Sequence, residues 1–191
     1  FGSVTGNDDI FTSGSVDSQH NALIYFPPNQ GKALIFPYDL DGFTQDPEVS
    51  IYESSAIRRL TATPELLRAY LGHVDDILNI AGNHRAMKPW SDFFEKKLPQ
   101  QKFDEHLEYI KKREISIQNQ LEHFAKPIDL SISISKTSAD QSSGKKQIEI
   151  SGEAWFNLRS LHLKGYEQPL KLSWSDLTHF STILEVQSNI E

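Results

Sequence analysis

The sequence contains no cysteine, which excludes disulfides and thiolate zinc sites. It also lacks any apolar run near the ~20 residues that a membrane-spanning helix requires. Bases are outnumbered by acids, 19 to 26, and the 191 residues carry a formal net charge of −7. Because duplex binding needs clusters of Lys and Arg, this balance argues against a nucleic-acid partner. The chain opens with Phe1 and shows neither an initiator Met nor a signal peptide, so we expect a processed chain or a fragment.

The first two thirds of the sequence predict a hairpin followed by helices. Residues 1–19 are rich in Gly, Ser, Thr and Asp, which is typical of a loop. Two apolar runs around a Pro/Asn/Gly turn then predict a β-hairpin over residues 21–38. Helical signals follow, and Thr63 with Pro64 marks the start of the strongest helix. The helices are expected at 54–62, 63–79, 87–98 and 100–124.

The last third predicts β-structure. Residues 128–135 alternate strictly between apolar and polar, and a polar loop is expected over 136–146. Further strands are expected at 147–152, 154–163, 170–174 and 180–186. We therefore predict an α+β fold with a boundary near Lys126. Residues 1–126 form the first domain, and residues 127–191 form a small β module that need not be complete.

Two acids, Asp39 and Asp41, come directly after the second strand of the predicted hairpin. Residues two apart in a strand point to the same side, and acids at the end of a buried strand need a cationic partner. Carboxylate oxygens are ligands that Mg²⁺, Mn²⁺ and Ca²⁺ prefer. Two other interpretations stay open, namely an exposed Asp-Gly turn and a calcium loop. An EF-hand loop would need three acids or amides at alternate positions before the glycine, and only two precede Gly42.

The residues before the hairpin complete a pattern. Asp9 and Asp17 lie in the upstream loop, and Asn21 directly precedes the first strand. Protein kinases use the same order, in which a loop Asp takes the substrate proton and an Asn and a later Asp bind the metal ions. A hairpin returns the chain to its starting point, so Asn21 and Asp39 can meet around one metal cluster.

Several short motifs in this order resemble the C-terminal half of the CotH spore-coat kinase-like domain, over residues 1 to about 124. That family typically shows "GNWDS", then "HN" or "KN" before an aromatic strand, then "PWDLD". Here the corresponding stretches read "GNDDI", "HNALIY" and "PYDLD". The later runs "SSAIRRLTATPELLRAYL" and "YIKKREISIQNQL" are also similar to family sequences.

The resemblance implies a kinase-like C-terminal lobe and an atypical protein kinase. Such an enzyme transfers the ATP γ-phosphoryl to Ser or Thr of surface or spore-coat proteins, with Mg²⁺ or Mn²⁺. By position Asp9 matches the catalytic base, although Asp17 could serve instead. Asn21 matches the amide metal ligand, and Asp39 with Asp41 matches the two acids of "WDLD". A secreted, cell-envelope or spore-surface location is implied as well.

The sequence also departs from the family pattern. Asp8 and Tyr38 stand where the family has Trp, and nothing before Asp9 could supply the Lys and Gly-rich segment of an N-terminal lobe. The β module resembles small immunoglobulin-like domains that follow this kinase-like domain, and would act as a spacer or substrate-docking element. The alternative function is a non-catalytic surface or adhesion protein that binds through the β module.

The sequence also predicts the surroundings of three other residues. Trp155 and Trp174 are expected in the core of the β module. The run "YIKKRE" is expected to be a charged outer face of its helix, in which Arg113 could pair inward with a core acid.

Overall fold

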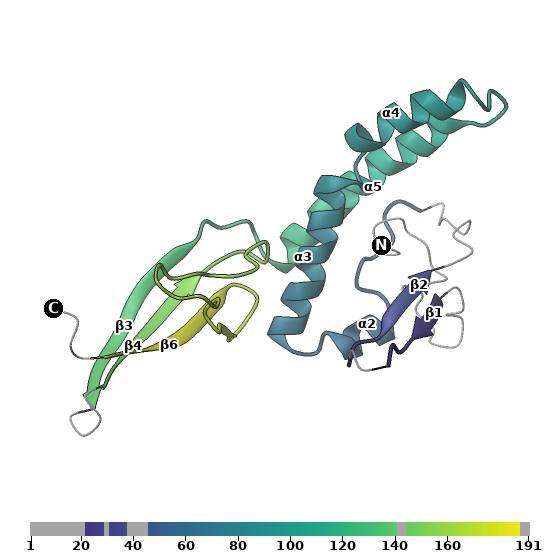
Figure 1. The fold of residues 1–191 in the computed structure, drawn as a ribbon. Coiled ribbons are helices and arrows are strands. Elements are labelled where there is room, and N and C mark those ends of the chain that lie inside the picture. The colour runs from purple at the N-terminus through teal and green to yellow at the C-terminus, as the bar shows by residue number, and fades with distance from the viewer. Residues whose placement is uncertain (1–21, 29–30, 38–45, 141–144, 188–191) are drawn as a thin grey trace. The chain divides into compact units, whose positions relative to one another are not determined.

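The computed structural model describes residues 22–28, 31–37, 46–140 and 145–187. Within them the fold is mixed α+β, with four helices, a two-stranded hairpin and a four-stranded antiparallel sheet (Figure 1). The chain divides into two compact units. The first comprises Phe1–Ala62 with His73–Leu121, and the second comprises Thr63–Gly72 with Glu122–Glu191.

The predicted hairpin is present in the first unit. Strands β1 (Ala22–Tyr25) and β2 (Leu34–Pro37) pair antiparallel, and Ala22 lies opposite Pro37. The connecting turn contains Gly31 at φ 61°, a left-handed conformation that favours glycine. The hairpin prediction is therefore confirmed. Its register places the first residue of β1, Ala22, beside the last residue of β2, Pro37.

All four predicted helices form, each with a polar cap or an apolar stripe that explains it. Thr63 accepts a hydrogen bond from the backbone N–H of Leu66 at 3.4 Å, which confirms the expected N-cap. Asn83 caps its helix by accepting from the N–H of Ala86 at 2.9 Å, so this helix begins three residues before the expected start. The helices are α2 (Ser55–Leu60), α3 (Pro64–Ile80), α4 (His84–Glu95) and α5 (Phe103–Phe124).

The core of the first unit is built from apolar residues of the helices and of the segment before α2. On α5 the buried apolar residues are Ile117 and Leu121. Other apolar residues that repeat along the helix are partly buried, namely Phe103, Leu107, Ile110 and Phe124. The other buried apolar residues of this unit are Ile51, Ile57, Val74 and Leu78. Across the part of the chain that the structure describes, each helix is too short or too polar to cross a bilayer.

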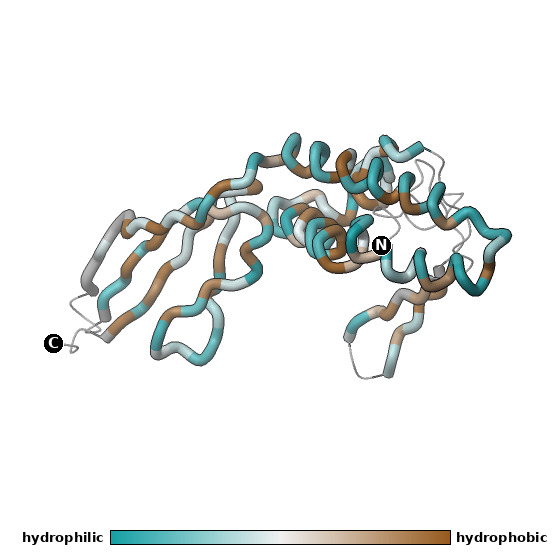
Figure 2. Tube along the Cα trace, turned by 90° about the horizontal axis from the view of Figure 1, so that it is seen from above, coloured by the Kyte–Doolittle hydropathy of each residue, from teal (hydrophilic) through white to brown (hydrophobic). Residues whose placement is uncertain are grey.

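The second unit contains the four-stranded sheet, with strand order β3-β4-β6-β5. Its strands are β3 (Ser131–Asp140), β4 (Lys145–Glu153), β5 (Ser173–Trp174) and β6 (His179–Gln187). Hydrophobic positions lie between hydrophilic ones along these strands (Figure 2).

Two sequence predictions for this unit are wrong. The polar stretch that begins at Lys136 continues β3 as far as Asp140, because a bulge between Ile134 and Lys136 resets the pairing with β4. The strand expected over 154–163 is absent, and a turn stands there, in which the N–H of Leu158 donates to the carbonyl of Trp155 at 3.1 Å. Its apolar residues are used for packing instead, since Ala154 and Phe156 are buried.

Aromatic packing and one glycine organise the core of the second unit. Phe180 is buried on β6, and the ring of Trp174 lies 5.1 Å from it between centroids. A Cβ added at Gly152 would lie 2.5 Å from the Phe180 ring, so only glycine leaves room for it. The indole N–H of Trp155 donates to the carbonyl of Ala125 at 2.7 Å. Both tryptophans make contacts within the unit, but each is only partly buried, so they line the core and are not fully inside it as the sequence predicts.

Candidate functional site

The five predicted site residues, Asp9, Asp17, Asn21, Asp39 and Asp41, lie outside the described residues. The described hairpin lies between Asn21 and Asp39 in the sequence. Asn21 precedes Ala22 by one residue and Asp39 follows Pro37 by two. Because Ala22 and Pro37 are directly paired, the chain leaves the hairpin beside the point where it enters.

The segment that follows the two acids is fixed to α5. The guanidinium of Arg113, only 2% exposed, donates to the carbonyl of Pro47 at 2.8 Å and also to that of Val49. The side chain of Gln120 accepts from the N–H of Ile51 at 2.8 Å and donates to the same Val49 carbonyl at 3.2 Å. Arg113 thus points inward, and the segment 47–51 is held by side chains of a long helix.

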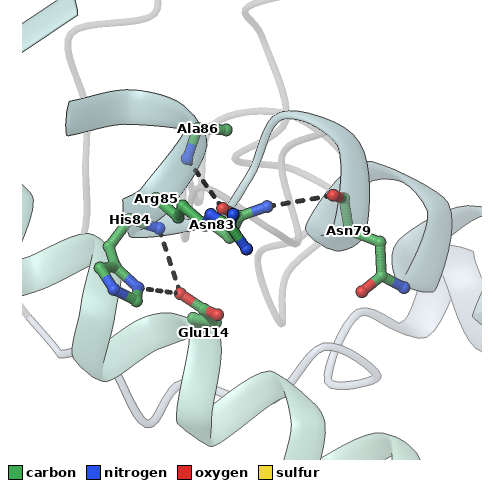
Figure 3. Close-up of a pocket in the computed structure, with 6 residues that line it drawn as sticks. All are labelled: Asn79, Asn83, His84, Arg85, Ala86 and Glu114. Atoms are coloured by element: carbon green, nitrogen blue, oxygen red, sulfur yellow. Dashed lines mark hydrogen bonds and ion pairs between the residues drawn. The ribbon is translucent and has the colours of Figure 1, made fainter. Parts of the chain in front are cut away.

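An open depression of about 550 Å³ lies where α3, α4 and α5 meet (Figure 3). It is lined by Asn79, Asn83, His84, Arg85, Ala86 and Glu114. Asn83 donates to the carbonyls of Leu78 at 2.7 Å and of Asn79 at 3.2 Å while it caps α4, so one side chain serves two helices.

The centre of this depression is a contact between His84 and Glu114. The Glu114 carboxylate accepts from the His84 backbone N–H at 3.1 Å and lies 2.6 Å from Nδ1 of the same residue. A carboxylate in this position makes Nδ1 the donor. The polar groups Asn83, His84 and Glu114 join three helices, and we assign the depression no catalytic role.

A second polar cluster lies at the start of β6, and sequence reasoning did not identify it. His179 contacts Glu153 through Nε2 at 2.8 Å and Asp176 through Nδ1 at 2.9 Å. Hydrogen bonding to Asp176, together with the charges of Asp176 and Glu153, raises the pKa of His179. Desolvation would raise the pKa of Asp176, but hydrogen bonds from Thr178 and His179 lower it to about 2. Because both ring nitrogens face carboxylates, His179 acts here as a bridging cation and not as a base.

The described part of the chain holds no group of three or more His, Asp or Glu residues that could bind a metal ion. The metal-site prediction therefore depends on Asn21, Asp39 and Asp41. Their donor atoms are one amide and two carboxylate oxygens, which suit Mg²⁺ or Mn²⁺.

No protein-family model matches the chain, and neither a curated protein nor a solved structure matches it. The resemblance to the CotH family consequently depends on the sequence motifs and their order.

Proposed function

We propose that this chain contains the C-terminal part of an atypical protein kinase of the CotH spore-coat type. The reaction is transfer of the ATP γ-phosphoryl to Ser or Thr hydroxyls of cell-surface or spore-coat-type proteins. The observation that carries the proposal is the antiparallel register of β1 and β2, in which Ala22 pairs with Pro37. A hairpin at this place in the sequence is consistent with the acid–Asn–hairpin–acid order, in which protein kinases place their metal-binding Asn and Asp.

Each predicted residue has a role in this proposal. Asn21, Asp39 and Asp41 would hold Mg²⁺ or Mn²⁺, which offsets the charge of the ATP phosphates. Asp9, or Asp17 in its place, accepts the proton of the substrate hydroxyl. Little covalent chemistry is asked of the protein, since phosphoryl transfer depends mainly on positioning and charge stabilisation.

The contacts of α5 support this arrangement. The segment that carries Asp39 and Asp41 joins β2 on one side and segment 47–51 on the other. Arg113 and Gln120 fix segment 47–51 through four hydrogen bonds to its backbone. Segment 47–51, which follows the acidic segment in the sequence, is therefore attached to α5.

The finer fold assignments belong to the same proposal. The helical part corresponds to a kinase-like C-terminal lobe, and the ATP pocket needs an N-terminal lobe to complete it. The four-stranded sheet corresponds to an immunoglobulin-like module that acts as a spacer or docks a Ser/Thr-rich protein substrate. Secretion, or a place in the cell envelope or on a spore surface, follows from the resemblance.

A second candidate is a non-catalytic surface or adhesion protein. The observation that favours it is the apolar edge of the sheet, where Ile132 is 50% and Ile134 is 67% exposed on β3. An apolar edge of this kind suits binding of another protein. The replacement of Trp by Asp8 and by Tyr38 in the kinase motifs also fits a decayed active site.

Phosphotransfer by the longest native polypeptide that contains this sequence separates the two candidates. We expect Mg²⁺-dependent transfer from γ-labelled ATP, and a loss of at least ~100-fold in Asn21→Ala, Asp39→Ala and Asp41→Ala. Asp129→Ala is the matched control, because this acid is exposed and lies outside the motif. A wild-type rate of phosphoryl transfer in all three motif variants would refute the kinase assignment, and so would nucleotide binding that does not depend on Mg²⁺.

A further inference from the structure

The C-terminal half of α4 and the turn that follows it carry a cluster of exposed apolar side chains, most of them aromatic. Trp90 is 60%, Phe93 52% and Phe94 41% exposed, and Leu98 beyond them is 49% exposed. The rings are stacked on one another. The centroid of the Phe94 ring lies 6.4 Å from that of Trp90 and 6.3 Å from that of Phe103 on α5. Phe93 meets Phe94 edge-on at 5.2 Å. We call these five residues the aromatic patch.

Most of the aromatic patch lies on one face of α4. Residues 90, 93, 94 and 97 share that face at helical spacing, and α4 has no buried residue. Half-exposed rings in contact with one another form an apolar surface that water solvates poorly. Contiguous surfaces of this kind mark contact sites more often than scattered apolar residues do.

Positive charge accompanies the patch. The stretch 96–103 contains Lys96, Lys97 and Lys102 and no acid, although the whole chain carries −7. The ammonium of Lys97 lies 6.0 Å from the centre of the Phe93 ring. Within the described residues Lys102 pairs with Glu105, whereas Lys96 and Lys97 make no ion pair.

The acids of α4 lie on another face of that helix, whereas Asp104 and Glu105 directly follow Phe103 on α5. Lys88 pairs with Asp92 at 2.8 Å, and its pKa is raised by that hydrogen bond and by the charges of Asp92, Asp104 and Glu95. At helical spacing residues 88, 92 and 95 lie opposite residue 90. At this spacing the rings and Lys97 are separated from the carboxylates of α4, and Lys96 lies between the two faces.

We propose that the aromatic patch, with Lys96 and Lys97, docks the protein on an anionic lipid surface. Trp and Phe rings enter the boundary between headgroups and acyl chains, where an aromatic ring is favourable. The lysine stems extend from the patch and bring their ammonium groups to lipid phosphates and carboxylates. An anionic lipid surface fits both the rings and the lysines, because it has an apolar layer for the rings and negatively charged headgroups for the ammonium groups.

Vesicle binding by the full chain tests this proposal. We expect co-sedimentation with vesicles of phosphatidylcholine and about 25% phosphatidylserine, and much weaker binding to pure phosphatidylcholine. Lys96→Gln with Lys97→Gln should weaken binding about 25-fold, since each lysine near an anionic surface contributes about 5-fold. Phe93→Ser with Leu98→Ser should abolish binding.

Two matched controls test whether binding depends on the aromatic patch and its lysines, and not on exposed lysines or exposed apolar side chains elsewhere in the protein. Lys111→Gln with Lys112→Gln removes an exposed lysine pair from α5, and Ile183→Ser removes an exposed apolar side chain from β6. Both should bind like the wild type. Circular dichroism and elution volume check that every variant is folded.

Fluorescence supplies an independent readout. Vesicles should shift tryptophan emission to the blue in the wild type and not in Trp90→Phe, which should still bind. Equal binding to neutral vesicles, or unchanged binding by the patch variants, would overturn the proposal. So would absence of vesicle binding together with self-association that Phe93→Ser with Leu98→Ser removes, because the patch would then join copies of the chain.

Discussion

At the residue scale, two buried arginines hold loops by donating to backbone carbonyls. Arg113 holds segment 47–51 in the first unit. In the second unit Arg68, 4% exposed, donates to the carbonyls of Ala154, Trp155 and Leu177, and lies 3.3 Å from the centre of the Trp174 ring. Burial, and then the charge of Arg159, lower the pKa of Arg68 to about 10, so it stays charged at neutral pH.

Replacing Arg68 should destabilise the second unit. Arg68→Met leaves three carbonyls without their donor, and we expect a loss of about 3 kcal/mol in the free energy of unfolding. Urea unfolding followed by tryptophan fluorescence measures it. Arg59→Met, on the exposed face of α2, is the control and should change stability by less than about 0.5 kcal/mol. Equal midpoints for both variants would show that the Arg68 contacts contribute nothing.

The contacts of His179 make stability depend on pH. The folded-state pKa of His179 is raised above 6.5, so its contribution is full below pH 6.5 and is lost as the pH rises through the raised value. The pKa of Asp176 is lowered from 3.8 to about 2, so its contribution is present above pH 3.8 and is lost as the pH falls toward 2.

The thermal midpoint of the second unit should therefore fall on the alkaline side of pH 6.5. His179→Gln should remove that decline, whereas His162→Gln should keep it. Near-ultraviolet circular dichroism from pH 5 to 9, about one pH unit at a time, gives the comparison. An identical decline in His179→Gln would assign the effect to another group.

At the scale of elements, the sheet depends on the absence of one side chain. A Cβ at position 152 would lie 2.3 Å from the carbonyl oxygen of Ser131 and 2.5 Å from the Phe180 ring. Gly152→Ala should cost about 2–3 kcal/mol, because neither β3 nor the ring can move freely. Chemical denaturation measures the loss, and Phe180→Leu in the same chain should recover part of it. If Gly152→Ala alone is as stable as the wild type, the sheet is less tightly packed here than the structure indicates.

One asparagine joins α3 and α4. Asn83 caps α4 and donates to two carbonyls at the end of α3, so Asn83→Ala removes three hydrogen bonds. We expect a loss of about 1–2 kcal/mol, measured as a lower urea midpoint. Asn79→Ala loses one exposed side-chain contact with Asp75 and should be almost neutral. Similar losses in the two variants would contradict a special role for the cap.

The helices and the hairpin could be predicted because their signals are local. Thr63 and Pro64 start α3, and the stripe through Ile117 and Leu121 identifies the inner face of α5. The strand expected over 154–163 failed because the apolar residues Ala154 and Phe156 pack against the core from a turn. The contacts of Arg68, Arg113 and His179 depend on partners distant in sequence, and no spacing rule reveals these. The metal-site residues remain a prediction.

At the scale of the whole molecule, the division of the chain differs from a simple cut at Lys126. The first half of α3, residues 63–72, belongs to the second unit and supplies Arg68 to it. A fragment of residues 127–191 lacks that guanidinium, whereas a fragment of residues 63–191 contains it.

We therefore expect the longer fragment to be the better folded of the two. Residues 63–191 should give dispersed amide resonances and resist protease, and residues 127–191 should do so less or not at all. Arg68→Met in the longer fragment is the matched control and should bring it close to the shorter one. Equal dispersion in both fragments would place the domain boundary at Lys126 after all.

Because β3 lies at the edge of its sheet, it affects how readily the protein aggregates at high concentration. Strand edges are templates on which further chains can add, and alternating Ser and Ile over Ser131–Ile134 is a suitable surface for fibril growth. The bulge after Ile134 interrupts such growth by bending the strand. We therefore expect a deletion that removes this bulge to make the protein more prone to add strands at the edge of β3.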